Sequence, residues 1–215
     1  MTRKHYLLWT VAIAAITLAA TLLVYRRLPA LIPSHWNAAG QLDGHGPRGW
    51  LFTQPVLLVL VALLWAVLPG VSPDKFRVGG FSQTWWYCGI VVAALLAYIQ
   101  AVLLWGASTG AMPMPRALLG GIGIGIALLG NVLGKVRRNF WLGVRTPWTL
   151  ASERVWYATH RLAAKTMVAG GLAALGAALL DLPFHVGMFA ILAGALVPAG
   201  YSLIYYKRLE STGGA

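Results

Sequence analysis

Six apolar runs, each about as long as a bilayer is thick, occupy most of this sequence of 215 residues. A helix that crosses the hydrocarbon core needs about 20 mainly apolar residues. No Lys or Arg lies near the middle of any of the runs. Because the bilayer core offers no water to backbone groups, segments of this kind must be helical. We expect spans at residues 6–25, 52–70, 85–105, 117–134, 163–181 and 185–206.

The composition excludes a soluble globular domain. Charged residues make up 10% of the chain and hydrophobic residues 59%, whereas soluble proteins carry roughly 25% charged residues. The net charge of +12 has a simple source, because the cytoplasmic flanks of membrane helices collect Lys and Arg. We therefore expect no nucleic-acid binding. Cys88 is the only cysteine, which excludes an internal disulfide and a cysteine-based metal site, and we expect no cofactor.

The basic residues also predict the orientation. If the N-terminus is cytoplasmic, thirteen Lys and Arg residues fall in the inward segments. Four fall in the outward segments: Arg26, Arg27, Arg48 and Arg116. Short inward loops carry the excess of positive charge in membrane proteins. We therefore expect both termini and the loop of residues 135–162 in the cytoplasm, with the loop of residues 26–51 facing outward.

Glycines cluster in the fourth and fifth spans. The fourth contains five and the fifth three: Gly120, Gly121, Gly123, Gly125 and Gly130, then Gly170, Gly171 and Gly176. A phosphate-binding glycine loop needs a strand before it and a helix after it, which a membrane span does not provide. Small residues in spans let helices approach closely. The glycines therefore predict tight helix packing.

The outward loop concentrates polar and aromatic residues and admits three interpretations. His35, Asp43 and His45 offer imidazole and carboxylate ligands for a divalent metal, although their spacing is not that of a zinc signature. Alternatively, Trp36 and Trp50 anchor the loop at the headgroups while Asp43 caps a turn. In the third interpretation the loop caps the outer mouth of the bundle, where it meets a peptide or another ligand.

The inward loop of residues 135–162 is polar, basic and rich in tryptophan, which a simple connection between spans does not require. After Pro147 and Trp148, Thr149 is a good helix N-cap. A helical repeat from Leu150 aligns two neighbouring stripes: Val155, Thr159 and Leu162, and then Glu153, Trp156 and His160. This pattern predicts an amphipathic helix on the inner membrane surface that leads into the fifth span.

The segment before that helix is compact and rich in turn-forming residues. It contains Asn139, Gly143, Arg145, Thr146, Pro147 and Trp148. One interpretation is a docking surface for a cytoplasmic partner or a lipid headgroup, since Arg145 offers a planar fork and Trp148 a face for stacking. In the other, Arg145, Asn139, His160 and Asn131 of the fourth span bond to one another and to helix ends, and so hold the bundle closed. Both interpretations stay open.

These residues resemble the signature of the SdpI family, bacterial membrane proteins named for immunity to a secreted killing factor. The resemblance rests on Gly130-Asn131, Lys135, Arg137, Asn139, Gly143, the run from Arg145 to Leu150, Val155-Trp156 and Thr159-His160. Ile32-Pro33, His35-Trp36, Gly40 and Asp43 resemble a domain of unknown function that often precedes that signature. Arg138 stands where the family pattern has Pro.

The resemblance implies a multi-helix immunity protein of the bacterial cytoplasmic membrane. In the best-known member, the cytoplasmic side also captures an autorepressor when the toxic peptide is present. The site residues that it implies here are those of the inward signature and, in the outward loop, Pro33, His35, Trp36, Gly40 and Asp43. We expect residues 1–84 to hold the first two spans with the outward loop, and residues 85–215 to form the SdpI-like region.

The sequence thus predicts an all-α polytopic bundle of six transmembrane helices plus a cytoplasmic amphipathic helix. We predict a non-enzymatic immunity or sensor protein. Its partners would be the lipid bilayer, a secreted peptide toxin outside and a cytoplasmic repressor at residues 135–162. The alternative is a small transporter or a protein that handles lipid or peptide, although the spans have no ionisable residue near their centres to mark a pathway. Glu153 and His160 are the only acid–histidine pair on one predicted face, without a nucleophile beside them, so we expect no enzyme.

Overall fold

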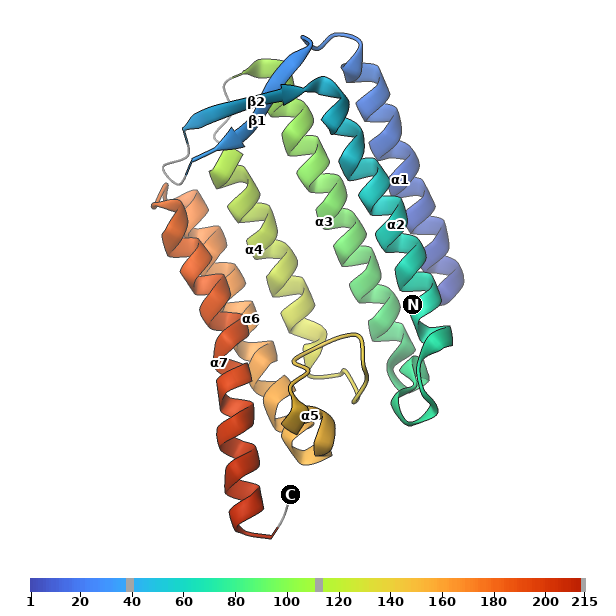
Figure 1. The fold of residues 1–215 in the computed structure, drawn as a ribbon, viewed down its shortest axis with the longest axis vertical. Coiled ribbons are helices and arrows are strands. Elements are labelled where there is room, and N and C mark those ends of the chain that lie inside the picture. The colour runs from blue at the N-terminus through green and yellow to red at the C-terminus, as the bar shows by residue number, and fades with distance from the viewer. Residues whose placement is uncertain (38–40, 111–113, 214–215) are drawn as a thin grey trace.

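The protein is a bundle of six long helices that lie side by side (Figure 1). A computed structural model describes residues 1–37, 41–110 and 114–213. Six helices in these ranges are long and apolar enough to cross a membrane, which confirms the predicted all-α polytopic bundle. Their α-helical parts are α1 Arg3–Tyr25, α2 Thr53–Val67, α3 Ser82–Thr109, α4 Met114–Leu133, α6 Glu153–Leu179 and α7 Phe184–Ser211. Helix α2 reaches the length of a span together with the 3₁₀ turns that flank it, as the stretch Arg48–Val71. The short elements are β1 Leu31–Trp36, β2 Leu42–Pro47, α5 Pro147–Ala151 and four 3₁₀ segments, η1 Arg48–Phe52, η2 Leu68–Val71, η3 Asp74–Phe76 and η4 Val78–Phe81.

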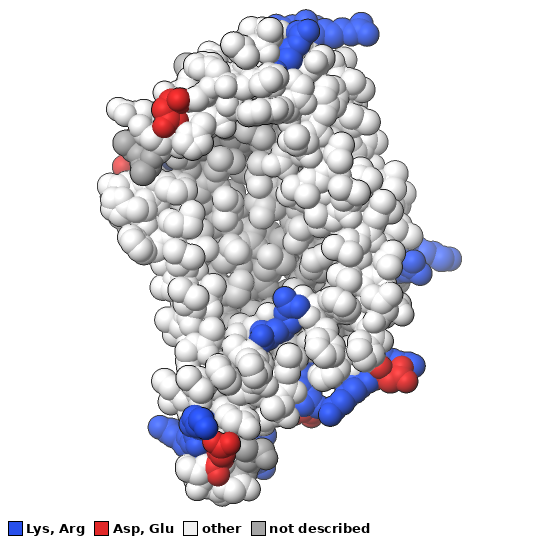
Figure 2. Space-filling model, in the orientation of Figure 1, with Lys and Arg blue, Asp and Glu red and all other residues white. Residues whose placement is uncertain are grey.

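The surface of the bundle suits a membrane. On the face shown in Figure 2, charged side chains lie near one end and over the lower half, with a broad uncharged band between them. Large apolar side chains are exposed along the helices, for example Leu8, Ile16 and Leu23 on α1. In water such a surface would be costly, whereas lipid tails cover it without penalty. The chain is therefore a multi-pass membrane protein.

The helices form two groups of three. In the first group α1 and α2 pack against α3, and in the second α6 packs extensively against both α4 and α7. Contacts between α3 and α4 join the groups (Figure 1). Both termini lie toward one end of the bundle, called the loop end because it also carries the α4–α6 loop of residues 134–152. The opposite end is called the hairpin end.

Glycines hold the second group together, as the sequence predicts. A Cβ on Gly123 of α4 would lie 2.6 Å from the carbonyl oxygen of Gly171 on α6. A Cβ on Gly194 of α7 would lie 2.7 Å from the carbonyl oxygen of Thr166 on α6. The hydroxyl of Thr166 in turn donates to the Gly194 carbonyl at 2.7 Å. With no apolar driving force between helices in lipid, such close backbone contact is what stabilises their association.

The loop of residues 26–51, which the sequence predicts to face outward, contains a β-hairpin that the sequence analysis did not predict. Strands β1 and β2 pair antiparallel, with an irregular register between Pro33 and Trp36. Proline and glycine interrupt both strands, which hides the strand pattern in the sequence. The hairpin is seated on the bundle because Ile32 is buried in a cluster with Leu51 and with Leu104 of α3. Gly40 falls outside the described residues.

The predicted surface helix is wrong. The short helix α5 is capped by Thr146, not Thr149, and Ser152 then takes an extended conformation. Helix α6 begins at Glu153 and continues without a break to Leu179, so the helix that contains the fifth span starts ten residues before the expected span. The predicted amphipathic stripes are the first turns of this helix, and Trp156 on them is fully buried. The apolar stripe packs against other helices instead of lipid.

Replacement of Gly171 by Ala is expected to destabilise the protein by about 1–3 kcal/mol, because the new Cβ would strike the carbonyl oxygen of Gly123 in a packed interface. Thermal unfolding of the purified protein in detergent measures the loss. Gly176→Ala on the same helix is the matched control, since no heavy atom lies within 4 Å of its added Cβ. Equal unfolding temperatures for the two variants would contradict the close-packing account.

Candidate functional site

Asn139 organises the first turn of the α4–α6 loop. Its side-chain amide donates to the carbonyl of Arg137 at 2.8 Å and to that of Leu142 at 3.1 Å. Its side-chain oxygen accepts from the backbone N–H groups of Trp141 at 2.7 Å and Leu142 at 2.8 Å. Asn139 is fully buried, so these four bonds satisfy an amide that would otherwise be costly to bury. They also fold the irregular backbone into a fixed turn.

Trp156 and His160 form the buried centre of the site. The indole N–H of Trp156 donates to the carbonyl of Val136 at 2.8 Å, just beyond the end of α4. The imidazole of His160 stacks on the indole with ring centres 4.0 Å apart. His160 Nδ1 lies 2.8 Å from the Trp156 carbonyl, and its Nε2 accepts the backbone N–H of Val144 at 3.1 Å. These partners assign a neutral imidazole with the proton on Nδ1.

Gly143 is required at its position beside this histidine. Its φ of +112° lies in a region that side chains disfavour. A Cβ there would also collide with Nε2 of His160. The glycine therefore lets the loop backbone pass directly over the imidazole edge, and this approach brings the N–H of Val144 within reach of Nε2.

Thr146 and Thr149 form a reciprocal cap at the start of α5. The N–H of Thr146 donates to Oγ1 of Thr149 at 2.9 Å, and the N–H of Thr149 donates to Oγ1 of Thr146 at 3.3 Å. Oγ1 of Thr146 also lies 3.2 Å from Oγ of Ser202 on α7. The indole N–H of Trp148 donates to the same serine oxygen. The start of α5 is thereby fixed to α7.

The loop contacts both groups of helices. The indole N–H of Trp141 donates to Oγ of Ser72 at 2.7 Å, between α2 and α3. The ring of Phe140 meets that of Phe76 edge-on, with centres 4.4 Å apart. Trp148 meanwhile contacts Ser202 of the other group. The α4–α6 loop is therefore a brace across the loop end.

Arginines at the rim of the loop bond mainly to backbone carbonyls. Arg138 donates to the carbonyls of Leu150 at 3.0 Å and Ala151 at 3.3 Å, and pairs with Glu153 at 3.4 Å. Arg138 thus links the loop to the start of α6. Arg145 donates to the carbonyl of Phe140 and is otherwise exposed.

The structure brings together most of the predicted inward residues, but not all. Asn139, Gly143, Thr146, Trp148, Trp156 and His160 lie in one bonded network, as described above. Asn131 is exposed and has no side-chain hydrogen bond within the described ranges. Arg145 bonds to backbone, so the predicted bonding among Arg145, Asn131, Asn139 and His160 themselves is wrong. Thr159 is fully buried, and its hydroxyl has no hydrogen-bond partner among the described residues. Pro147 is exposed as the first residue of α5.

At the hairpin end, His35 and Asp43 face each other across the two strands. His35 Nδ1 lies 2.5 Å from Oδ1 of Asp43, and the two side chains are 70% and 43% exposed. The Asp43 carboxylate therefore pairs with His35 across the hairpin, whose connecting residues 38–40 lie outside the described ranges. In the described part of the chain no three His, Cys, Asp or Glu side chains gather to hold a metal ion, so His45 does not join the pair. Pro33 and Trp36 are half-buried in β1.

Sequence reasoning missed several contributors because their partners are far away along the chain. Ser72 and Ser202 look like ordinary loop and helix serines, yet each accepts an indole N–H of the loop. Gln100 of α3 is buried and donates to Oγ1 of Thr21 and to the carbonyl of Leu51, both at 2.9 Å. A polar amide within an apolar span was the one available signal for Gln100.

Replacement of Asn139 by Ala is expected to lower the free energy of unfolding by about 2–4 kcal/mol, because four partly buried backbone groups lose their partner. Unfolding in detergent measures the change, and proteolysis within residues 134–152 should accelerate. Asn131→Ala is the control: this exposed side chain makes no hydrogen bond with described residues, so the change should stay within about 0.5 kcal/mol. Similar losses for both variants would argue against a brace.

Comparison with known proteins agrees with this arrangement. Residues 135–206 match the SdpI/YfhL protein family, and residues 12–59 match a domain of unknown function, DUF1648. The chain is 25% identical over 207 residues to Immunity protein SdpI of Bacillus subtilis (strain 168), covering 94% of this chain and 97% of the relative. No solved structure gave a significant match. The predicted resemblance is confirmed: the region that carries the brace, α6 and most of α7 is similar to the SdpI/YfhL protein family.

Proposed function

We propose that this chain is a non-enzymatic immunity protein that protects a bacterium against a membrane-active peptide and signals to a cytoplasmic regulator. The observation that carries the proposal is the length of the match to Immunity protein SdpI. It covers 94% of the chain, so both the hairpin and the α4–α6 loop lie within it. A role that needs both ends of the bundle is therefore better supported than one that needs a single loop.

The proposed orientation has both termini in the cytoplasm and the hairpin outside. The thirteen-to-four distribution of Lys and Arg supports it. Three of the four predicted outward arginines, Arg26, Arg27 and Arg48, flank the hairpin in sequence. An even number of spans agrees with the location of both termini at the loop end (Figure 1).

The hairpin is the proposed recognition surface for the peptide. Its two strands are the only ones among the described residues, so each keeps an outer edge without a neighbouring strand. Such edges pair readily with an extended peptide. Leu31 and Leu42 are 60% and 38% exposed, and the exposed Asp43 offers a carboxylate to a cationic group. A peptide with apolar and basic residues complements this surface.

The proposed surface for the regulator lies on the exposed rim of the α4–α6 loop. Asn139, Trp156 and His160 are fully buried, so a partner cannot contact them without opening the loop. Arg145 and Pro147, two residues apart in the sequence, are both exposed. The buried part of the signature would set the shape of the rim, and the rim would make the contact with a cytoplasmic repressor.

A non-enzymatic role is supported by the contacts of Glu153 and His160, the one acid–histidine pair that the sequence predicts on a common face. Glu153 pairs with Arg138, whereas His160 bonds to backbone groups and stacks on Trp156. Nδ1 and Nε2 of His160 both have backbone partners, so neither nitrogen is available to act as a general base without rearrangement.

Expression of this chain in a bacterium sensitive to the secreted killing factor should restore growth in its presence. The double change His35→Ala with Asp43→Ala should remove most of that protection while the protein remains in the membrane at the same level. Ser34→Ala on the same strand is the control and should protect fully. The proposed recognition by the hairpin would be refuted by either of two results: the wild-type protein fails to restore growth, or the double variant restores growth as well as the wild type does.

Arg145→Ala should weaken capture of the regulator by membranes, measured by pull-down or by a reporter of the repressed gene. Immunity should persist, because the changed side chain lies at the opposite end from the hairpin. Lys75→Ala, an exposed basic residue at the loop end, serves as the control for loss of one charge. If Arg145→Ala leaves both the pull-down of the regulator and the reporter signal at the wild-type level, the exposed rim is not the surface that binds the regulator.

A further inference from the structure

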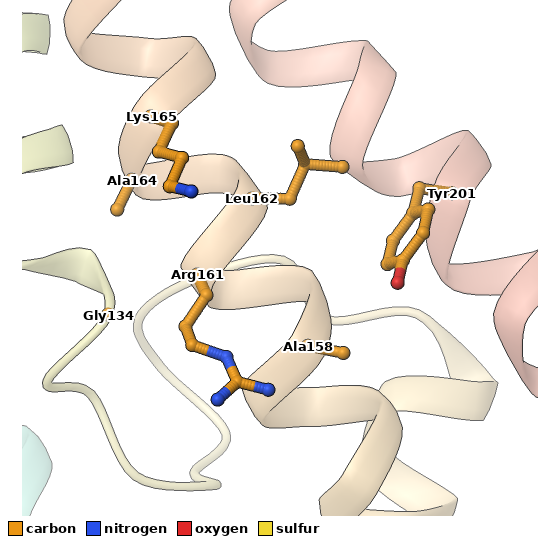
Figure 3. Close-up of a pocket in the computed structure, with 7 residues that line it drawn as sticks. All are labelled: Gly134, Ala158, Arg161, Leu162, Ala164, Lys165 and Tyr201. Atoms are coloured by element: carbon orange, nitrogen blue, oxygen red, sulfur yellow. The ribbon is translucent and has the colours of Figure 1, made fainter.

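A basic pocket lies on α6 at the loop end, outside the brace described above. Its volume is about 480 Å³, and Figure 3 shows it flanked by Gly134 at the end of α4 and by Tyr201 of α7. Arg161 and Lys165 stand one turn apart on α6 and both project on the pocket side (Figure 3). Ala158 and Ala164 contribute only methyl groups, which leaves room beside the two cations.

Neither cation of the pocket has a partner among the residues that the structure describes. The five acidic residues of the sequence each bond to another basic side chain: Asp43 to His35, Asp74 to Arg77, Glu153 to Arg138, Asp181 to Arg116 and Glu210 to Lys207. Arg161 and Lys165 make no side-chain hydrogen bond or ion pair with any described residue. Like charges four residues apart on a helix repel, so an anion between them would relieve a cost already present in the fold.

The depth of the pocket identifies the kind of anion. Arg161 lies just before the apolar stretch of residues 163–181, and Lys165 lies at its start; the helix that contains this stretch is long and apolar enough to span the membrane. Beyond them the same helix exposes Leu172, at 54%, to the region of the lipid tails. Basic pockets between membrane helices at the headgroup level bind anionic lipid headgroups. Arg161 matches a phosphate with two N–H groups, Lys165 adds a point charge, and the Tyr201 hydroxyl is a further donor.

We propose that this pocket binds the phosphodiester headgroup of an anionic phospholipid, held between Arg161 and Lys165. The acyl chains of that lipid lie along the exposed apolar surface of α6. The bound lipid stabilises the junction of α4, α6 and α7 beside the brace. This site is independent of the proposed immunity function, since it involves neither the hairpin nor the exposed rim of the loop.

The test uses the full-length protein in detergent and phosphatidylglycerol as the probe, with bound lipid counted by native mass spectrometry. Arg161→Gln with Lys165→Gln should weaken binding roughly 30-fold, the effect of about 1 kcal/mol for each of two basic residues. Arg3→Gln with Lys4→Gln removes the same charge from two exposed residues of α1 at the loop end and should bind as wild type does. Phosphatidylcholine should bind far more weakly than phosphatidylglycerol.

Four results would overturn the proposal. Equal weakening by the two double variants would mean that net charge alone attracts the lipid. Equal binding of phosphatidylcholine would mean that the anion is not recognised. Full displacement of phosphatidylglycerol by millimolar inorganic phosphate would assign the pocket to a soluble anion. As a test of shape, Ala158→Leu keeps both charges and narrows the pocket, so unchanged binding in that variant would also count against the site.

Discussion

The hydrogen bond from the Trp156 indole to the carbonyl of Val136 is the contact on which the loop end depends. Backbone that leaves a helix at the membrane boundary must have its polar groups satisfied within the protein. Trp156 does this for the exit from α4, and the stacked His160 does it for the N–H of Val144. The same indole belongs to a buried cluster with Tyr6 and Trp85 of the other helix group. The Trp156 side chain thus satisfies a backbone carbonyl and also packs between the two groups of helices.

The two ends of the bundle satisfy the hydrogen-bonding groups of their backbone by different means. At the hairpin end, backbone pairs with backbone in β1 and β2, and the Gln100 amide bonds to Thr21 and Leu51 beneath it. At the loop end, side chains satisfy an irregular backbone. A hairpin leaves its strand edges open, whereas the side-chain network closes on itself. This difference favours recognition of an extended ligand at the hairpin end and a fixed surface at the loop end.

The spans were predictable because length and hydropathy alone specify them, and the glycines of α4 and α6 were predictable as packing contacts. The start of α6 was not predictable, because the sequence pattern of an apolar stripe is the same whether the stripe contacts lipid or protein. The hairpin was hidden by Pro33, Gly44 and Gly46, which are poor strand formers. In the candidate site, the sequence identified the loop residues but not Ser72 or Ser202. Their roles arise from partners 69 and 54 residues away, a distance that no local pattern spans.

The distribution of charged side chains determines which groups are free to bind molecules outside the chain. Every acidic side chain already has a basic partner, so the surplus of +12 has no counter-charge within the chain. Burial divides the signature further: Asn139, Trp156 and His160 are inaccessible, and exposed basic groups such as Arg145 and Arg161 remain for external anions. A change in the buried set therefore acts through stability, whereas a change in the exposed set acts through binding. The two classes are separable by measuring unfolding and association on the same variants.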